Sequence, residues 1–143
     1  MSQKTDESEP SVAVDSRIAY ISPYANLNGA NLMGLDLCGK DLTGAVLSAA
    51  NLTGVNLSDA RLSRANLTGA RLSHANLSGA NLMGANLRRA VLDHASLAGA
   101  DLSASDLCGS ELRFADVGSA NLSGVLWDYA TRWPEGFNPP RSR

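Results

Sequence analysis

The 143-residue chain is poor in several kinds of residue, and each shortage excludes a class of protein. Two cysteines are too few for a disulfide framework. No run of about eighteen apolar residues occurs, so no transmembrane helix is predicted. The first twenty residues are polar and acidic and lack the apolar run of a secretory signal, so we expect a cytoplasmic protein.

Signatures of catalysis are also absent. No serine lies in a GxSxG motif, and no glycine-rich stretch ends in the GK[S/T] of a phosphate-binding loop. The many serines stand at turn positions. We therefore expect no enzyme, no catalytic residues and no cofactor.

What the sequence does contain is a five-residue repeat between residues 25 and 124. Its central position, from residue 27 to residue 122, is leucine in nineteen of twenty units and Val117 in the other. Alanine stands two residues earlier in fifteen units, Asn or Asp lies between them in fourteen, and glycine follows two residues later in eleven. Because a period of five matches neither an α-helix nor a flat strand, the chain must turn a corner in every unit.

Each position of this A(N/D)LxG unit has a physical reason. Alanine and leucine, two residues apart, point inward, and the Asn or Asp between them points outward. Glycine tolerates the positive φ of a type II turn. Where glycine is replaced by a larger residue at Arg64, His74, Arg89, His94 and Phe114, we expect a negative φ and a different corner. Lys40 stands at an inward alanine position, and we expect a bulge, a snorkelling side chain or an end effect there.

Units such as ANLSGANLMGANL resemble those of the pentapeptide repeat family. The resemblance implies an all-β fold, a right-handed quadrilateral parallel β-helix with twenty residues per coil. Twenty units then make about five coils. The later stretch VLWDYATRWPEGFNPP resembles a closing segment common in bacterial members.

Four regions follow from this interpretation. We expect a disordered polar tail at 1–16, an N-terminal cap at 17–24, the β-helix at 25–124, and an aromatic C-terminal cap and tail at 125–143. Only one of the seven aromatic residues lies within the repeats, and large rings fit the ends of an Ala- and Leu-lined tube better than its interior. The aromatic C-terminal end is either a lid on a monomer or a dimer interface.

Residues twenty apart would stack under such a coil, which places His74, His94 and Phe114 in one column. Two imidazoles are too few ligands for a convincing metal site, so we interpret them as solvated corner residues and expect no metal. Cys38 and Cys108 would lie on opposite faces as free, partly exposed thiols. The arginines fall on several faces without interleaved aromatics, so no direct nucleic-acid binding is expected.

These observations predict a non-enzymatic rigid scaffold that presents a protein-interaction surface to an unidentified protein. The predicted contact residues are five of the corners at which another residue stands in place of glycine: Arg64, His74, Arg89, His94 and Phe114. The resemblance implies an alternative, a DNA mimic that binds a type II topoisomerase (gyrase) and protects it from inhibitors. Residues 25–124 carry eight acids and seven bases, however, a poor copy of DNA with one charge per about 1.7 Å. A purely structural repeat element is a third alternative.

Overall fold

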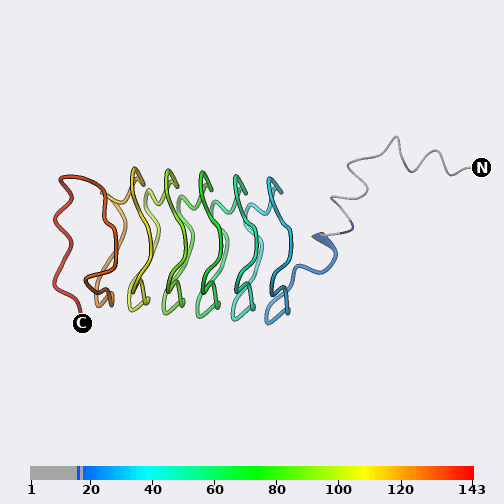
Figure 1. Cartoon of the computed structure of the whole chain (residues 1–143). Coiled ribbons are helices and arrows are strands. Elements are labelled where there is room, and N and C mark those ends of the chain that lie inside the picture. Colours follow the sequence, from blue (N-terminus) through cyan, green and yellow to red (C-terminus); the bar gives the residue numbers. More distant parts are fainter. Residues whose placement is uncertain (1–15, 17) are drawn as a thin grey trace, which may run out of the picture.

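A computed structural model describes residue 16 and residues 18–143. The tail expected at 1–16 therefore lies, apart from Ser16, outside the described residues. Ser16 and Ile18 are helical, and the N–H of Ala19 donates to the Ser16 carbonyl at 3.2 Å. This turn leads into a stack of coils that extends along one axis (Figure 1).

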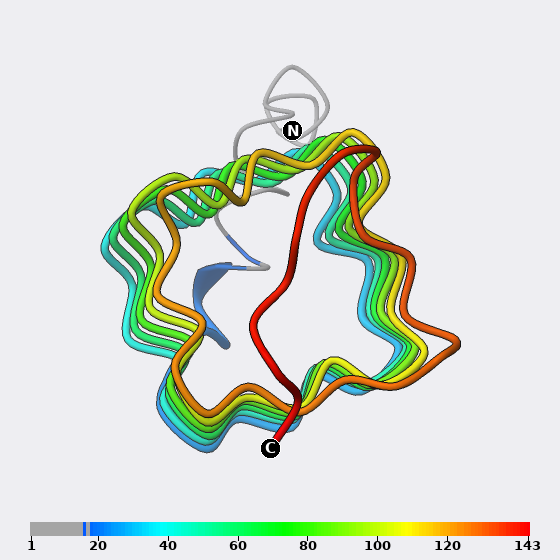
Figure 2. The same ribbon diagram turned by 90° about the vertical axis from the view of Figure 1, so that its left-hand side faces the viewer.

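Parallel β-bridges join the coils, and each bridge connects residues twenty apart. The first pairs Asn26 with Val46, and this register continues to Asp106 and Leu126. Successive bridges are five residues apart, so a coil has four sides, as its outline shows along the axis (Figure 2). In the described part of the chain the pairing consists of isolated bridges rather than longer strands, because each unit uses two of its five residues for a turn.

Backbone hydrogen bonds run from each coil to the next and back. The N–H of Leu27 donates to the Val46 carbonyl at 2.7 Å, and the N–H of Val46 donates to the Ala25 carbonyl at 2.8 Å. A further bond closes each corner, as from the Ala30 N–H to the Leu27 carbonyl at 3.0 Å. The short sides therefore satisfy their backbone groups through stacking, as strands do in a parallel sheet.

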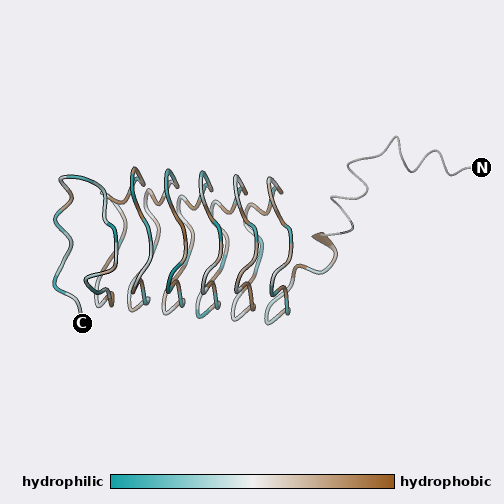
Figure 3. Cartoon of the chain, viewed as in Figure 1, coloured by the Kyte–Doolittle hydropathy of each residue, from teal (hydrophilic) through white to brown (hydrophobic). Residues whose placement is uncertain are grey.

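The interior consists of the alanine and leucine positions, which confirms the inward orientation expected from the repeat. Every central residue from Leu32 to Val117 is at most 3% exposed. Apolar and polar residues alternate along each coil, so every coil contributes to the interior (Figure 3). Burying one leucine contributes about 1.5–3 kcal/mol before the entropy of ordering the chain is subtracted, so the column of leucines is the main source of stability.

Lys40 does not distort the ladder. Its N–H donates to the Leu37 carbonyl at 3.1 Å, and its carbonyl accepts from the N–H of Arg61 at 2.9 Å, as in neighbouring units. The residue is exposed, whereas Ala60, in the same column of the next coil, is buried. Of the three expectations for Lys40, the backbone contradicts a bulge and agrees with an end effect in the first coil, residues 25–44.

The C-terminal end is closed by aromatic rings that pack against the core. Trp127 and Trp133 meet edge to face at 5.9 Å between centroids, and Trp133 lies 5.3 Å from Phe137. Residue 132 takes the place of residue 131 in the bridge to Glu111, so the last coil contains one extra residue. The chain then crosses the end of the tube, held by a bond from Trp127 Nε1 to the Pro140 carbonyl at 2.8 Å (Figure 2).

Candidate functional site

The five predicted contact residues at corners adopt the same backbone conformation as the repeat glycines, so the expected negative φ is wrong. Their φ values lie between 57° and 64°, against 65° to 72° for the repeat glycines. Ala49, Asp59 and Ala104 behave in the same way. A positive φ at the third residue of the turn is the mark of a type II turn, so the repeat corners share one geometry except at Ser119, which does not have a positive φ.

Most of these corners share this conformation because their N–H groups donate to backbone carbonyls of the next coil. The His74 N–H donates to the Asp93 carbonyl at 3.1 Å, and the His94 N–H donates to the Arg113 carbonyl at 3.0 Å. Glycine corners make the same bond, as from Gly54 to Ser73 at 2.9 Å. A negative φ would break this hydrogen-bond register. The free-energy cost of leaving the backbone bond unmade is about as large as the 1–2 kcal/mol cost of a residue in the left-handed conformation.

Three of the five residues lie together in one column. The ring centroids of His74 and His94 are 4.8 Å apart with the planes at 4°, and His94 and Phe114 are 4.8 Å apart at 13°. All three side chains are exposed, and Phe114 is 72% exposed. We call His74, His94 and Phe114 the aromatic column; earlier coils have Gly34 and Gly54 at the same corner.

The other two residues are not part of this site. Arg64 and Arg89 lie on two different corners, each over a glycine of the following coil. The Cγ of Arg89 is 3.2 Å from the point that a Cβ on Gly109 would occupy, and the Cγ of Arg64 is 3.6 Å from the corresponding point on Gly84. The structure therefore groups the three aromatic corners and separates the two arginines from them.

The stacked histidines do not have the geometry of a shared zinc ligand pair. Zinc binds imidazole nitrogen at about 2.0–2.1 Å, so two nitrogens on one ion are at most about 4.2 Å apart. Two parallel rings with centroids 4.8 Å apart direct their in-plane lone pairs side by side and not toward one point. Within the described residues no group of three or more His, Cys, Asp or Glu could hold a metal ion.

The charged groups beside the aromatic column are already paired. Asp93 Oδ1 accepts from the backbone N–H of Arg113 at 3.0 Å. The Arg113 guanidinium in turn lies 3.4 Å from Glu111 Oε1. What the column offers to a partner is therefore ring surface more than net charge.

The outward Asn and Asp residues hold the turns through hydrogen bonds of their side chains. In most units their Oδ1 accepts from the backbone N–H two residues later, as in Thr43 to Asp41 at 3.0 Å. A Ser or Thr hydroxyl often adds a second bond, as from Thr53 to Asn51 at 2.7 Å. The Thr43 hydroxyl is the main reason that the pKa of Asp41 is lowered. The signal was present in the recurring Asn-Leu-Ser/Thr triplets, which are the signature of these turns.

The two cysteines are free, as expected, but they are not equally accessible. Cys38 is exposed, whereas Cys108 is buried, which corrects the expectation of two partly exposed thiols. Burial, together with the neighbouring Asp106 carboxylate, raises the pKa of the Cys108 thiol to about 11. The Asp106 carboxylate also pairs with Arg88 at 3.0 Å, so this group is a structural network and its thiol is unreactive.

Comparison with known proteins agrees with this geometry. The family model described as pentapeptide repeats matches at residues 25–64, 50–89, 60–97 and 85–124. The pentapeptide repeat protein Rfr23 from the cyanobacterium Cyanothece 51142 is 41% identical, with a TM-score of 0.64, over 65% of this chain and 63% of that one. Among curated proteins, no relative matches the chain.

Two further solved structures are similar to the chain. A pentapeptide repeat protein from the thylakoid lumen of Arabidopsis thaliana is 26% identical, with a TM-score of 0.51, over 66% of this chain and 63% of that one. The pentapeptide repeat protein alr5209 from Nostoc is 32% identical over 90% of this chain and 88% of that one, with a TM-score of 0.29. The matched part of our chain thus spans 63% of the length of Rfr23 and of the Arabidopsis protein.

No helix in residues 16 and 18–143 has the length and apolar character needed to cross a membrane.

Proposed function

The chain belongs to the pentapeptide repeat family, and from this premise we propose that it is a non-enzymatic, rigid scaffold that binds another protein through its corners. The proposal includes a right-handed quadrilateral parallel β-helix of about five coils. The bridges between residues twenty apart and the four-sided outline support this architecture (Figure 2). A stack held by backbone bonds on every side presents its surface without an ordering cost on binding.

The aromatic column is the single observation that carries the proposal. Phe114 is 72% exposed, and all three rings stand at positions of positive φ, where glycine would be less strained. Stacking of the rings offsets part of that strain, by about 0.5–1.5 kcal/mol for each pair. An exposed row of rigid rings is typical of residues that contribute strongly to protein interfaces.

The Asn and Asp ladders contribute less to this surface, since local bonds already engage their side chains. Binding therefore depends on the corners, with the aromatic column at the centre and Arg64 and Arg89 as separate contacts. The unpaired cysteines suit a reducing compartment, and we place the protein in the bacterial cytoplasm as part of the proposal. A monomer, or a dimer formed through the aromatic C-terminal end, remains a prediction.

Partner capture with matched variants tests the proposal. The variant H74G/H94G/F114G restores the glycine of the repeat at three corners, so the fold is retained while the rings are lost. We expect a protein captured by the wild type to be lost from this variant and kept by the control A49G/A104G, which changes two corners outside the column. Equal capture by all three proteins contradicts the role of the aromatic column.

A gyrase supercoiling assay with a quinolone separates this proposal from the DNA-mimic alternative. The repeat body has a net charge of only −1, so we expect no inhibition and no protection at micromolar protein. Protection of gyrase from the quinolone would replace the scaffold proposal by topoisomerase binding.

A further inference from the structure

The aromatic column has an open end, the ring face of His74 that points away from His94. The two preceding coils have Gly34 and Gly54 at this corner. Apart from each glycine and its chain neighbours, no described atom lies within 4 Å of the point that a Cβ on either glycine would occupy. Because coils lie about 4.8 Å apart, the two glycines leave a strip about 10 Å long beside His74. We call the surface over Gly34 and Gly54 the open corner.

Where a large residue precedes a glycine at the same corner, its side chain covers that glycine. The Cγ of Arg64 is 3.6 Å from the Cβ point of Gly84, and the Cγ of Arg89 is 3.2 Å from that of Gly109. Corner side chains therefore lean toward the following coil. Gly54 stays uncovered because the residue before it at this corner is also a glycine, so the outer face of His74 is accessible.

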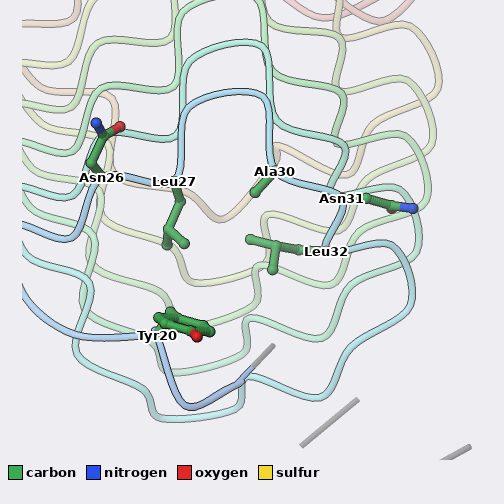
Figure 4. Close-up of a pocket in the computed structure, with 6 residues that line it drawn as sticks. All are labelled: Tyr20, Asn26, Leu27, Ala30, Asn31 and Leu32. Carbon is green, nitrogen blue, oxygen red and sulfur yellow. The ribbon is translucent and has the colours of Figure 1, made fainter. Parts of the chain in front are cut away.

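An apolar side chain borders the open corner. In the first coil Ala30 and Leu32 point into the tube, where they line a hollow, and Asn31 points away from it (Figure 4). Met33 follows at the turn, directly before Gly34, and it is 48% exposed. An apolar group that enters the open corner can therefore pack against the Met33 thioether.

The side of the tube that follows this corner is acidic. It contains three acids and no base, and it is made of residues 35–39, 55–59, 75–79, 95–99 and 115–119. The other three sides of residues 25–124 share five acids and seven bases. Within the described residues, no Lys or Arg nitrogen lies within 4 Å of the carboxylates of Asp36, Asp59 or Asp116. This side therefore attracts a positively charged group.

Asp36 is two residues from the open corner and has a fixed, exposed carboxylate. Its Oδ1 accepts from the backbone N–H of Cys38 at 3.2 Å and from Nδ2 of Asn56 at 3.1 Å. Neither donor carries a charge, so the negative charge of Asp36 is not neutralised by these bonds. The open corner thus combines a ring face, an apolar border and a carboxylate.

We propose that the open corner binds an arginine side chain of the partner protein, an inference that rests on the proposed function. A guanidinium is planar and cationic, so it stacks on the imidazole of His74 and is attracted by Asp36. The aliphatic part of the arginine packs against Met33. Lysine has the charge without the plane, and tryptophan has the plane without the charge.

Titration of the isotope-labelled full chain with short peptides tests this chemistry. The probe is acetyl-Gly-Arg-Gly-amide, and the comparison peptides carry lysine, citrulline or tryptophan in place of arginine, at constant pH and ionic strength. The imidazole signals of His74 report binding. We expect the arginine peptide to bind about threefold more tightly than each of the others, since only arginine uses both the ring and the charge. Equal or tighter binding of any comparison peptide would overturn the proposal.

A variant that fills the open corner locates the binding site. Arg64 and Arg89 show that the turn accepts arginine at a positive φ, so we expect G54R to fold and to cover His74 with its own guanidinium. Its affinity for the arginine peptide should fall about threefold or more. The control G29R adds the same charge at another uncovered glycine corner and should bind as the wild type does. Unchanged affinity in G54R would contradict the proposal.

A matched pair of neutralised acids tests the role of charge. We expect Asp36→Asn to weaken binding of the arginine peptide about twofold or more, because the amide keeps the size of the side chain and removes its charge. Asp116→Asn changes the same side of the tube four coils away and should leave the affinity unchanged. Equal affinities for the arginine peptide in Asp36→Asn and the wild type would show that this carboxylate does not hold the guanidinium.

Partner capture distinguishes failure of this inference from failure of the proposed function. Equal capture by the wild type and H74G/H94G/F114G contradicts the proposed function itself. Loss of the captured protein from that variant, with full retention by both G54R and D36N, contradicts only the arginine contact. Loss from all three variants supports the arginine contact at the open corner.

Discussion

The C-terminal end of the tube is closed by large rings, whereas the N-terminal end is covered by smaller, partly buried side chains. Trp127, Trp133 and Phe137 pack on the core and on one another, and the chain crosses above them. At the other end Ile18 and Ile21 leave a hollow of about 390 Å³. The two ends of the repeat are therefore closed in different ways. The large rings packed next to the last leucines fill the C-terminal end, whereas the side chains at the N-terminal end do not fill theirs.

Removal of a ring from each end should show this difference most strongly. We expect Trp133→Ala to destabilise the protein by about 3 kcal/mol, because it opens a cavity beneath the lid. Tyr20→Ala should cost about 0.5 kcal/mol, since the tyrosine is mostly exposed. Urea unfolding of both variants measures the two values, and equal losses would mean that the ends are closed equally well.

A second comparison concerns two buried serines near the C-terminal end. Ser105 and Ser110 both replace inward alanines and are fully buried. The Ser110 hydroxyl donates to the Leu107 carbonyl at 2.7 Å, whereas Ser105 Oγ has no partner among the described residues.

Alanine substitution should therefore have opposite effects at these two positions. We expect Ser105→Ala to stabilise the protein by about 1 kcal/mol, because an unpaired buried hydroxyl is removed. Ser110→Ala should destabilise it by about 1 kcal/mol, because a bond is lost. Thermal unfolding of both variants gives the signs, and a loss of stability in Ser105→Ala would show that its hydroxyl has a partner.

Corner strain, unlike end closure, should be the same along the tube. Ala49 and Ala104 have the same φ of 59° although they lie toward opposite ends. We expect Ala49→Gly and Ala104→Gly each to stabilise the protein by about 0.5–1 kcal/mol, since glycine relieves the left-handed conformation. Chemical denaturation of the two variants compares them. If only one of the two substitutions raised the free energy of unfolding, coil stacking would be weaker at the end where no gain was measured.

The smallest expected difference between the two ends concerns how the free energy of unfolding depends on pH. The pKa of Asp41, in the first coil, is lowered mainly by the Thr43 hydroxyl. Burial raises the pKa of Asp106, but bonds from Cys108 and Arg88 outweigh it and the net shift is downward. A lowered pKa in the folded state means that stability is present above the unfolded value of about 3.9 and is lost as pH falls through the folded value.

Thermal unfolding between about pH 5 and pH 2 should therefore show a loss of stability in the wild type. Asp106→Asn should flatten this profile more than Asp41→Asn, since the Asp106 side chain is 23% exposed and that of Asp41 is 41% exposed. Identical slopes for the wild type and Asp106→Asn would contradict a contribution from this carboxylate.

Much of the fold could be predicted from the sequence, and the candidate site only in part. The stacking of His74, His94 and Phe114 follows from the coil length that the family resemblance implies, and the rings do stack. Arg64 and Arg89 lie on two other corners, so their role as contacts stays a separate prediction. The burial of Cys108 could not be predicted from the repeat, which gives its position no inward role.

The sequence by itself determined that Ala and Leu share one apolar axis. In an extended segment, side chains two residues apart point to the same side, so Ala and Leu of each unit both point inward. This alternation is a local property of the backbone. Only the tertiary structure decided that His, Arg and Phe corners take the left-handed turn of glycine. A hydrogen bond to a residue nineteen positions later holds the His and Arg corners, and its loss would outweigh the local preference for negative φ.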